Sequence, residues 1–566
     1  MRPINHGLRI GLMLLAFIVS SSAQAGEREA LLGTMQAEME RNRTELKVDE
    51  YDLPYFIGYR IIDLRTTNIE ASFGALIEDD YLHERKAAVD VRVGSYDFDS
   101  HPDAEVRFDF DSGFRPSKNV PIDGDPDGLR ATLWLLTDAA YKKALSTYFK
   151  KKAKRVSTVK KTHVDSFSRE TPIQRVTPRV EVNVDRRVWR NLAKSLSKRF
   201  RTMPGLMTGK VGFEVEHIST SIVNSEGTRA LKEYAIYSVG ISASARAEDG
   251  MMLTQGKTRY ARSASTLPQK AELEAMVDGV MRDLAALRKA PVLDPYTGPA
   301  ILEPEAAGVF FHETIGHRLE GERQNDEQEG QTFKGQIGSE ILPAFIDVRD
   351  DPTSQVLQNV ELNGHYPFDD QGVPASNVVL VDKGVLKTFL TSRTPLEKVS
   401  ASNGHGRARG TRTPVARMGN LIVESHKVVS RKKLKEMLIA EAKAQGKPYG
   451  LIIADITGGS TNTSNYGYQA FKGTPRMVYR VDAETGNETL VRGVEMVGTP
   501  LTAINKLMAA GDQTGVFNGY CGAESGYVPV SAVAPSLLFR EIELQRTQRK
   551  KLRAPILKAP WNSDHR

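Results

Sequence analysis

Apolar residues recur at helical spacing in several parts of the chain. In residues 28–46, leucine and methionine return every three or four positions between charged residues, which is typical of an amphipathic helix. Similar patterns predict helices over residues 129–152, 187–200 and 268–288. A further helix is predicted to begin at Pro304, because proline suits the first helical turn.

Other segments alternate between apolar and polar residues, as half-buried strands do. Valines alternate with other residues in segments 89–93 and 180–184, so we expect a strand at each. Two hairpins are predicted nearer the C-terminus. The segments 378–390 and 477–491 each have β-prone runs on both sides of a polar turn, and the first turn contains Lys383-Gly384.

The strongest boundary signal lies at residues 289–299, where KAPVLDPYTGP contains three prolines and a glycine. A chain of 566 residues is too long for one compact core, and we expect two or three domains. We predict an α+β protein. A mixed N-terminal region over residues 26–290 is followed by a linker at 291–299. A strand-rich C-terminal domain over residues 300–566 is built against the one helix that carries candidate ligands.

The first 25 residues differ from the rest of the chain. Two arginines accompany an apolar stretch at residues 10–19, and the small-residue pattern Ala23-Gln24-Ala25 follows. The apolar stretch is too short to span a bilayer comfortably. We therefore expect residues 1–25 to be a signal peptide removed after Ala25, which leaves a periplasmic or secreted protein without a transmembrane segment. An uncleaved anchor is the alternative.

The overall charge of the chain does not indicate a particular class of ligand. The formal net charge is +7, which is mild for the length. The densest basic run, at residues 150–161, is interpreted as a solvated helix end that leads into a flexible loop, with anionic lipid as the alternative contact. Export argues against nucleic acid as a ligand.

Cys521 is the only cysteine, so the chain cannot form an internal disulfide. A single cysteine in an exported protein is often a buried, inert thiol. Metal ligation is the other reading, because a coordinated thiolate is less free to oxidise or to cross-link.

Candidate metal ligands lie close together in FHETIGHRLEGE, which contains His312, Glu313 and His317. Zinc prefers imidazole and thiolate ligands. In an ideal helix, the spacing of five residues turns the second imidazole about 140° from the first. Both rings can reach one ion only if the helix bulges between them or loosens at Gly316, since glycine tolerates unusual backbone angles.

Glu313 is the natural general base, because a carboxylate beside a zinc ligand can take a proton from the activated water. An amphipathic helix with two surface histidines and a salt-bridged glutamate is the alternative without a metal. Spacing leaves the third ligand open, and the candidates are Cys521, Glu320, Glu322, His365 and His405.

Two polar segments are candidates for substrate contact. Residues 457–463, TGGSTNT, are predicted to form a loop whose backbone pairs with an extended peptide, or an ordinary surface loop. Residues 407–412, RARGTR, are interpreted as a solvated basic loop, with binding of a substrate carboxylate as the alternative.

Four sequence blocks occur in a characteristic order. They are FHETIGHRLEGE, FKGQIGSEI at 333–341, DDQGVPASNVVLVDKGVLKTFLTSR at 369–393 and GYCGAESGYVPV at 519–530. Together they resemble the TldD/PmbA family of zinc metallopeptidases over about residues 299–544, whereas the N-terminal half resembles it more weakly. Three features depart from the family pattern: Ser525-Gly526 after the cysteine, the insertion at 150–169 and the basic tail at 548–553.

The resemblance implies one zinc ion per chain, bound by His312, His317 and Cys521, with Glu313 as catalytic base. It also implies a TldD-type active peptidase for unstructured or small peptides. Family members form homodimers, or heterodimers with an inactive paralogue, that enclose the site in a cavity. A non-catalytic partner or scaffold subunit is the main alternative. A thiol enzyme that uses Cys521 with His365 or His405 is a third reading.

Overall fold

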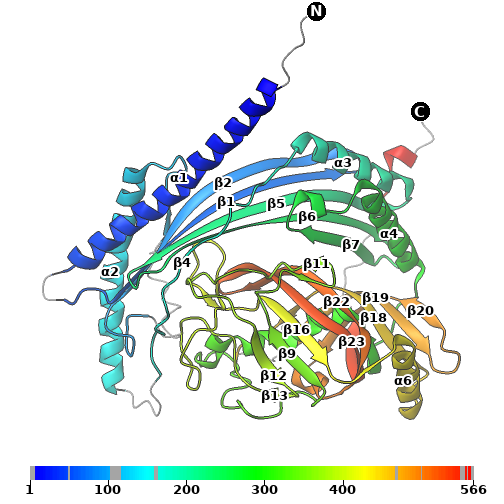
Figure 1. The fold of residues 1–566 in the computed structure, drawn as a ribbon. Helices are drawn as coiled ribbons and strands as arrows, with labels where there is room; N and C mark the ends of the chain where they lie inside the picture. The colour runs from blue at the N-terminus through cyan, green and yellow to red at the C-terminus, as the bar shows by residue number, and fades with distance from the viewer. Residues whose placement is uncertain are drawn as a thin grey trace, which may run out of the picture.

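The computed structural model describes residues 7–48, 51–101, 117–157, 164–465, 470–498 and 500–547, together with 553, 555–557 and 559–562. Figure 1 shows a long, curved sheet that arches over a second sheet, with helices α1 and α2 at one end of the arch and α3 and α4 at the other. The protein is α+β, as its sequence predicts.

The arching sheet has the strand order β3-β2-β1-β5-β6-β4, with β7 paired to β6. Its strands are β1 (Phe56–Ser72), β2 (Ala75–Arg92), β3 (Ser117–Asn119), β4 (Gln174–Val176), β5 (Leu206–Asn224), β6 (Arg229–Arg246) and β7 (Met252–Ala261). The helices of this part are α1 (Gly7–Glu45), α2 (Pro126–Ser157), α3 (Arg186–Lys198) and α4 (Lys270–Lys289).

The two faces of the arching sheet differ because successive side chains of a strand point to opposite sides. On β1, Ile57 and Tyr59 pack with α1 and α2, and Ile69 packs with α3 and α4. Asn68 and Glu70, at alternate positions, line a hollow that also contacts the C-terminal half. The helices therefore cover one face, and the opposite face looks onto the second sheet.

The second sheet follows the order β13-β12-β9-β16-β23-β21-β19-β18-β8, and β23 also pairs with β8, so five strands close into a ring. Its strands are β8 (Tyr296–Leu302), β9 (Ile346–Asp350), β12 (Val378–Asp382), β13 (Val385–Leu386), β16 (Asn420–Ser425), β17 (Val428–Val429), β18 (Tyr449–Thr461), β19 (Phe471–Asp482), β20 (Glu488–Val491), β21 (Val494–Gly498), β22 (Leu507–Ala523) and β23 (Gly526–Arg546). Short pairs form from β10 (Val356–Leu357) with β11 (Val360–Glu361), and from β14 (Gly406–Arg407) with β15 (Val415–Ala416). The helices are α5 (Pro304–Thr314), α6 (Arg431–Ala444) and α7 (Pro500–Ile504).

Both predicted hairpins are confirmed. Strand β12 pairs with β13 across Lys383-Gly384, and β19 pairs with β20 across the turn at residues 483–487. The helix α6, which the sequence analysis missed, packs leucines against β8 and β18.

Three expectations about segments need correction. The proposed linker at 291–299 overlaps β8, which begins at Tyr296 and belongs to the second sheet. Residues 180–184 form no strand. Their valines pack against the core beneath α3 and α4, but no neighbouring strand pairs with their backbone, and the Val180 amide donates to the Glu233 side chain instead. Residues 457–461 are the end of strand β18, not a loop.

Some predictions fall partly outside the described residues. The helix α1 runs through the expected cleavage site after Ala25, and residues 1–6 are not described. Residues 158–163 of the basic insertion and 548–552 of the basic tail are not described either. No helix in the described part of the chain combines the length and the apolar character needed to cross a bilayer.

The β12–β13 turn gives a test of the fold. Gly384 has φ of +79°, and a methyl group there would meet the Leu342 carbonyl oxygen. We expect Gly384→Ala to destabilise the protein by about 1–3 kcal/mol. The matched variant Lys383→Gly relieves a positive φ at the adjacent residue and should leave stability equal or higher. Thermal unfolding of the full chain measures both, and equal midpoints for Gly384→Ala and the unsubstituted chain would contradict this turn.

Candidate metal centre

The helix α5 holds the first two candidate residues in a fixed position because its residues 306–314 are buried. Phe310 packs edge-on against Phe471 and Phe539, with ring centroids 5.4 and 5.1 Å apart. Gly308 lies against strand β23, where an added methyl group would come within 2.9 Å of the Ala532 carbonyl oxygen. His312 and Glu313 follow in the last turn of this helix.

The α-helix ends between His312 and His317, the segment where the sequence predicts a distortion of the backbone. Helix α5 stops at Thr314, and a 3₁₀ turn spans Gly316–Leu319. Of the two distortions considered, the loosening at Gly316 is therefore present. Its cause differs from the one expected, because a side chain at Gly316 would collide with the Met418 sulfur. Space, rather than backbone angle, requires glycine here.

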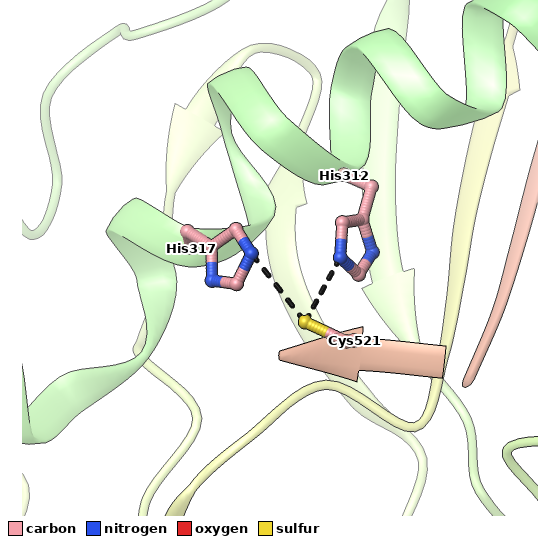
Figure 2. Close-up of side chains that lie close together, drawn as sticks. All are labelled: His312, His317 and Cys521. Carbon is pink, nitrogen blue, oxygen red and sulfur yellow. Dashed lines mark hydrogen bonds between the residues drawn. The ribbon is translucent and has the colours of Figure 1, made fainter. Parts of the chain in front are cut away.

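The structure brings both imidazoles to the sulfur of Cys521, which lies on β22 (Figure 2). The Nε2 atoms of His312 and His317 lie 3.1 and 3.4 Å from Sγ. The two rings are nearly perpendicular, at 82°. All three residues are buried, with 7%, 6% and 4% of their surface exposed.

This arrangement fits a zinc ion. One donor atom from each residue lies within 4.8 Å of the others. Two nitrogens and a sulfur at tetrahedral angles around zinc would be separated by about 3.5 Å, which is close to the observed spacing. Nitrogen and thiolate donors are also the types that zinc prefers.

The three groups favour their charged forms together. Burial raises the pKa of the Cys521 thiol, but the two imidazoles outweigh burial and hold this pKa well below its usual range. Burial lowers the pKa of His317, yet the thiolate and Glu320 raise it well above normal. A thiolate is therefore available as a metal ligand at neutral pH.

Glu313 lies beside this cluster. Its Oε2 is 3.9 Å from His317 Nε2, and Gly459 of β18 packs so closely that a methyl group there would meet the Glu313 side chain. Burial raises the pKa of Glu313, and the two histidines offset this only in part. A carboxylate whose pKa is raised toward neutrality is a better proton acceptor and donor than an ordinary glutamate.

Glu320 orients the second imidazole. Its Oε2 lies 3.0 Å from His317 Nδ1, which leaves Nε2 facing the sulfur. Arg417 donates to Glu320 and, through Nη2, to the Cys521 carbonyl oxygen at 2.7 Å. A carboxylate that holds the second nitrogen of a ligating histidine is common at zinc sites. Sequence reasoning treated Glu320 only as a competing ligand.

The other competing residues have separate structural partners. Glu322 accepts from Ser392 and from the Ala416 amide, and His365 Nδ1 contacts the Pro352 carbonyl oxygen. His405 is fully buried against Asp350 and Asn403. Within the described residues, the cluster that could hold a metal consists of His312, His317 and Cys521.

A cleft of about 1210 Å³ opens on this cluster. Its walls come from β7 of the arching sheet and from α5, β18, β19 and β22 of the C-terminal half. A second hollow of about 1030 Å³ shares residues 457–460 of its wall with the first. The candidate site therefore lies between the two sheets.

Comparison with known proteins agrees with this geometry. The PmbA/TldA metallopeptidase C-terminal domain model matches residues 295–546. A metalloprotease of Archaeoglobus fulgidus is 27% identical over 340 residues, which cover 57% of this chain and 72% of that protein. A zinc metalloprotease TldD homolog of Saccharolobus solfataricus is 24% identical over 249 residues, 44% of this chain and 51% of that protein. The crystal structure of TldE from Thermococcus kodakarensis matches with a TM-score of 0.60 and 13% identity, over 90% of this chain and all of that one.

Residues 295–546 of the chain belong to the TldD/PmbA family.

Its relatives in this family are named metalloproteases, which gives the chain a peptidase-family assignment. The similarity to TldE shows the fold alone. The match spans only about half of the TldD homolog from Saccharolobus solfataricus. The activity, substrates and partners of the whole protein are therefore proposed below.

Within this family fold, the two polar segments differ in structure from what the sequence predicts. Residues 457–461 form the β18 wall of the cleft. The segment 407–412 is not a solvated loop: Arg407 donates to two buried carbonyl oxygens, and Arg409 pairs with Glu216 of the arching sheet. Arg409 therefore ties the two sheets together, and Arg407 stabilises the C-terminal half. The contacts of both arginines are to the protein itself rather than to a substrate carboxylate.

Glu320 provides a test of how the centre is held. We expect Glu320→Gln to weaken zinc binding by about 10- to 100-fold, because His317 loses its charged orienting partner. Glu329→Gln is the matched control, because Glu329 also accepts from Arg323, whereas the carboxylate that contacts His317 is that of Glu320. Competition with a chelator measures both affinities, and equal zinc affinity in Glu320→Gln and the unsubstituted chain would contradict this positioning role.

Proposed function

We propose that the protein is an exported, zinc-dependent peptidase that hydrolyses unstructured or small peptides. The observation that carries this proposal is the convergence of His312, His317 and Cys521 on one point, with Glu313 beside them on the wall of a large cleft. The names of the related metalloproteases support the same reaction class.

In this proposal, His312 Nε2, His317 Nε2 and Cys521 Sγ hold the metal. A bound zinc ion supplies Lewis-acid activation of water and of the substrate carbonyl. Glu313 accepts a proton from the attacking water as its oxygen bonds to the carbonyl carbon. When the C–N bond breaks, Glu313 returns that proton to the leaving amine. Its raised pKa suits both steps.

The walls of the cleft favour an extended substrate. Strand β18 pairs with β8 only at Leu451–Ile453, whereas its pairing with β19 continues to Thr461. Beyond Ile453, no described strand occupies the β8 side of β18, and residues 454, 455 and 457–461 line the cleft there. A peptide backbone can pair with such a free strand edge independently of its side chains. This supports unstructured peptides rather than folded proteins as substrates.

A non-catalytic partner subunit is the second candidate function. The fold similarity to TldE gives this reading its support. Glu313 argues against it, because a purely structural zinc site has no need of a base beside its ligands. Assembly as a homodimer, or as a heterodimer with an inactive paralogue, and export after cleavage at Ala25 remain parts of the proposal.

Glu313→Gln tests the proposed chemistry. The substitution keeps the size of the side chain but removes its basicity. We expect peptidase activity to fall by about 10²- to 10⁴-fold, with zinc content unchanged. Hydrolysis of an unstructured peptide and metal analysis of the same sample are the measurements.

The control for this experiment is Glu436→Gln, which removes an exposed carboxylate on the outer helix α6. It should retain full activity. Full activity in zinc-loaded Glu313→Gln would show that the assigned base is wrong. Absence of activity in the unsubstituted, zinc-loaded chain would favour the partner subunit.

A further inference from the structure

The cleft contains a carboxylate that the proposed hydrolysis does not use. Glu305 lies in the first turn of α5, lines the cleft and has an exposed side chain. Within the described part of the chain, its carboxylate makes no hydrogen bond and no ion pair. Most other carboxylates near the centre are neutralised, as Glu320 is by Arg323 and Arg417.

Glu305 faces the same way as the metal centre. It precedes His312 by seven residues, which is nearly two full turns, so both side chains lie on one face of α5. The rise of 1.5 Å per residue places them about 10 Å apart along the helix. Val309 lies between them and also lines the cleft.

The charged groups around Glu305 come from three elements, and most have partners of their own. On β19 and β18, Arg476 donates to Asp455 at 2.7 Å. On β7, Lys257 lies 3.9 Å from Asp283, and Arg259 donates to the Thr258 carbonyl oxygen. Burial raises the pKa of Glu305, and Arg259 offsets this only in part. Among the described residues, none of these cations forms an ion pair with the Glu305 carboxylate.

We propose that Glu305 is a specificity-determining residue that binds a cationic group of the peptide substrate, about three residues from the bond that is cleaved. This inference rests on the proposed peptidase function. The distance follows from the geometry of an extended chain, which advances about 3.3 Å per residue. A peptide lying along residues 454–461 of β18 would pass from Glu313, beside Gly459, toward Asp455 and Glu305.

The cationic group has two possible sources, a lysine or arginine side chain and the terminal ammonium of a short peptide. Both present N–H donors and a positive charge to the carboxylate. An internal pairing of Glu305 with Arg259 is the competing arrangement, since Arg259 projects from the opposite sheet into the same cleft.

Peptide libraries test this proposal. The probes are acetylated ten-residue peptides of alanine, serine and glycine that carry one lysine, one glutamine or one glutamate at each position in turn. A second set has free N-termini and no lysine. Mass spectrometry locates the cleaved bond, and kcat/KM is compared between lysine and glutamine peptides for the zinc-loaded enzyme.

We expect the unsubstituted enzyme to prefer lysine over glutamine at one position about three residues from the cleaved bond, by about fivefold, the scale of a partly exposed ion pair. Glu305→Gln should abolish this preference and Glu305→Lys should reverse it toward glutamate peptides. Glu436→Gln should retain it. In the peptides with free N-termini, a preference for cleavage three residues from the ammonium would identify the terminal ammonium as the cationic group that Glu305 binds.

An enzyme without any lysine or ammonium preference, or one whose preference survives Glu305→Gln, would overturn the proposal. A lysine preference that emerges only in Arg259→Gln would do so as well, because Glu305 would then be occupied by Arg259 in the native enzyme.

A binding measurement separates this inference from the proposed function. In zinc-loaded Glu313→Gln, fluorescence anisotropy of labelled peptides gives Kd without turnover. Tighter binding of the lysine peptides, lost when Glu305→Gln is added, supports the role of Glu305 even if the unsubstituted enzyme hydrolyses nothing. Hydrolysis without a lysine preference would overturn only the assignment of Glu305.

Discussion

The meeting of one thiol and two imidazoles in a buried space is the constraint on which the rest of this half of the molecule depends. Charged groups removed from water cost free energy unless they are paired or bind a metal. The fold provides for this in several ways. Helix α5 is enclosed by core side chains, Gly316 allows the second histidine to turn back, and Glu320 and Arg417 hold the ring of His317 and the backbone of Cys521. Each of these contacts helps to fix the position of a donor atom.

The position of the site between two sheets follows from the same arrangement. The face of the arching sheet that carries polar residues looks onto the C-terminal half, and Arg409 with Glu216 bridges the two. This leaves a cleft with one wall from β7 and the others from the metal-bearing half. In the proposed function, this polar cleft between the two sheets binds an extended peptide, which links the architecture to the proposed choice of substrate.

The sequence predicted those helices and hairpins that depend on interactions between residues close together in the chain. The helix that carries His312 and Glu313, and the hairpin at Lys383-Gly384, follow from spacing and turn chemistry. The third donor is 204 residues away from His317, and no spacing rule connects them, so only the family resemblance selected Cys521 among the candidate third ligands.

Alternation in residues 180–184 indicated which side chains are buried but not whether a strand partner exists. The composition of 407–412 indicated charge but not the distant carbonyl and carboxylate groups that bury it. Nothing in the sequence indicated the role proposed for Glu305, because that role depends on whether a cation of the folded protein pairs with its carboxylate.

Zinc K-edge X-ray absorption on the purified, full-length protein tests the central claim most directly. The account predicts one zinc per chain, with one sulfur at about 2.3 Å and two imidazole nitrogens at about 2.0–2.1 Å, and loss of the sulfur contribution in Cys521→Ser. A protein without stoichiometric metal, or a bound zinc whose coordination shell contains no sulfur, would contradict it.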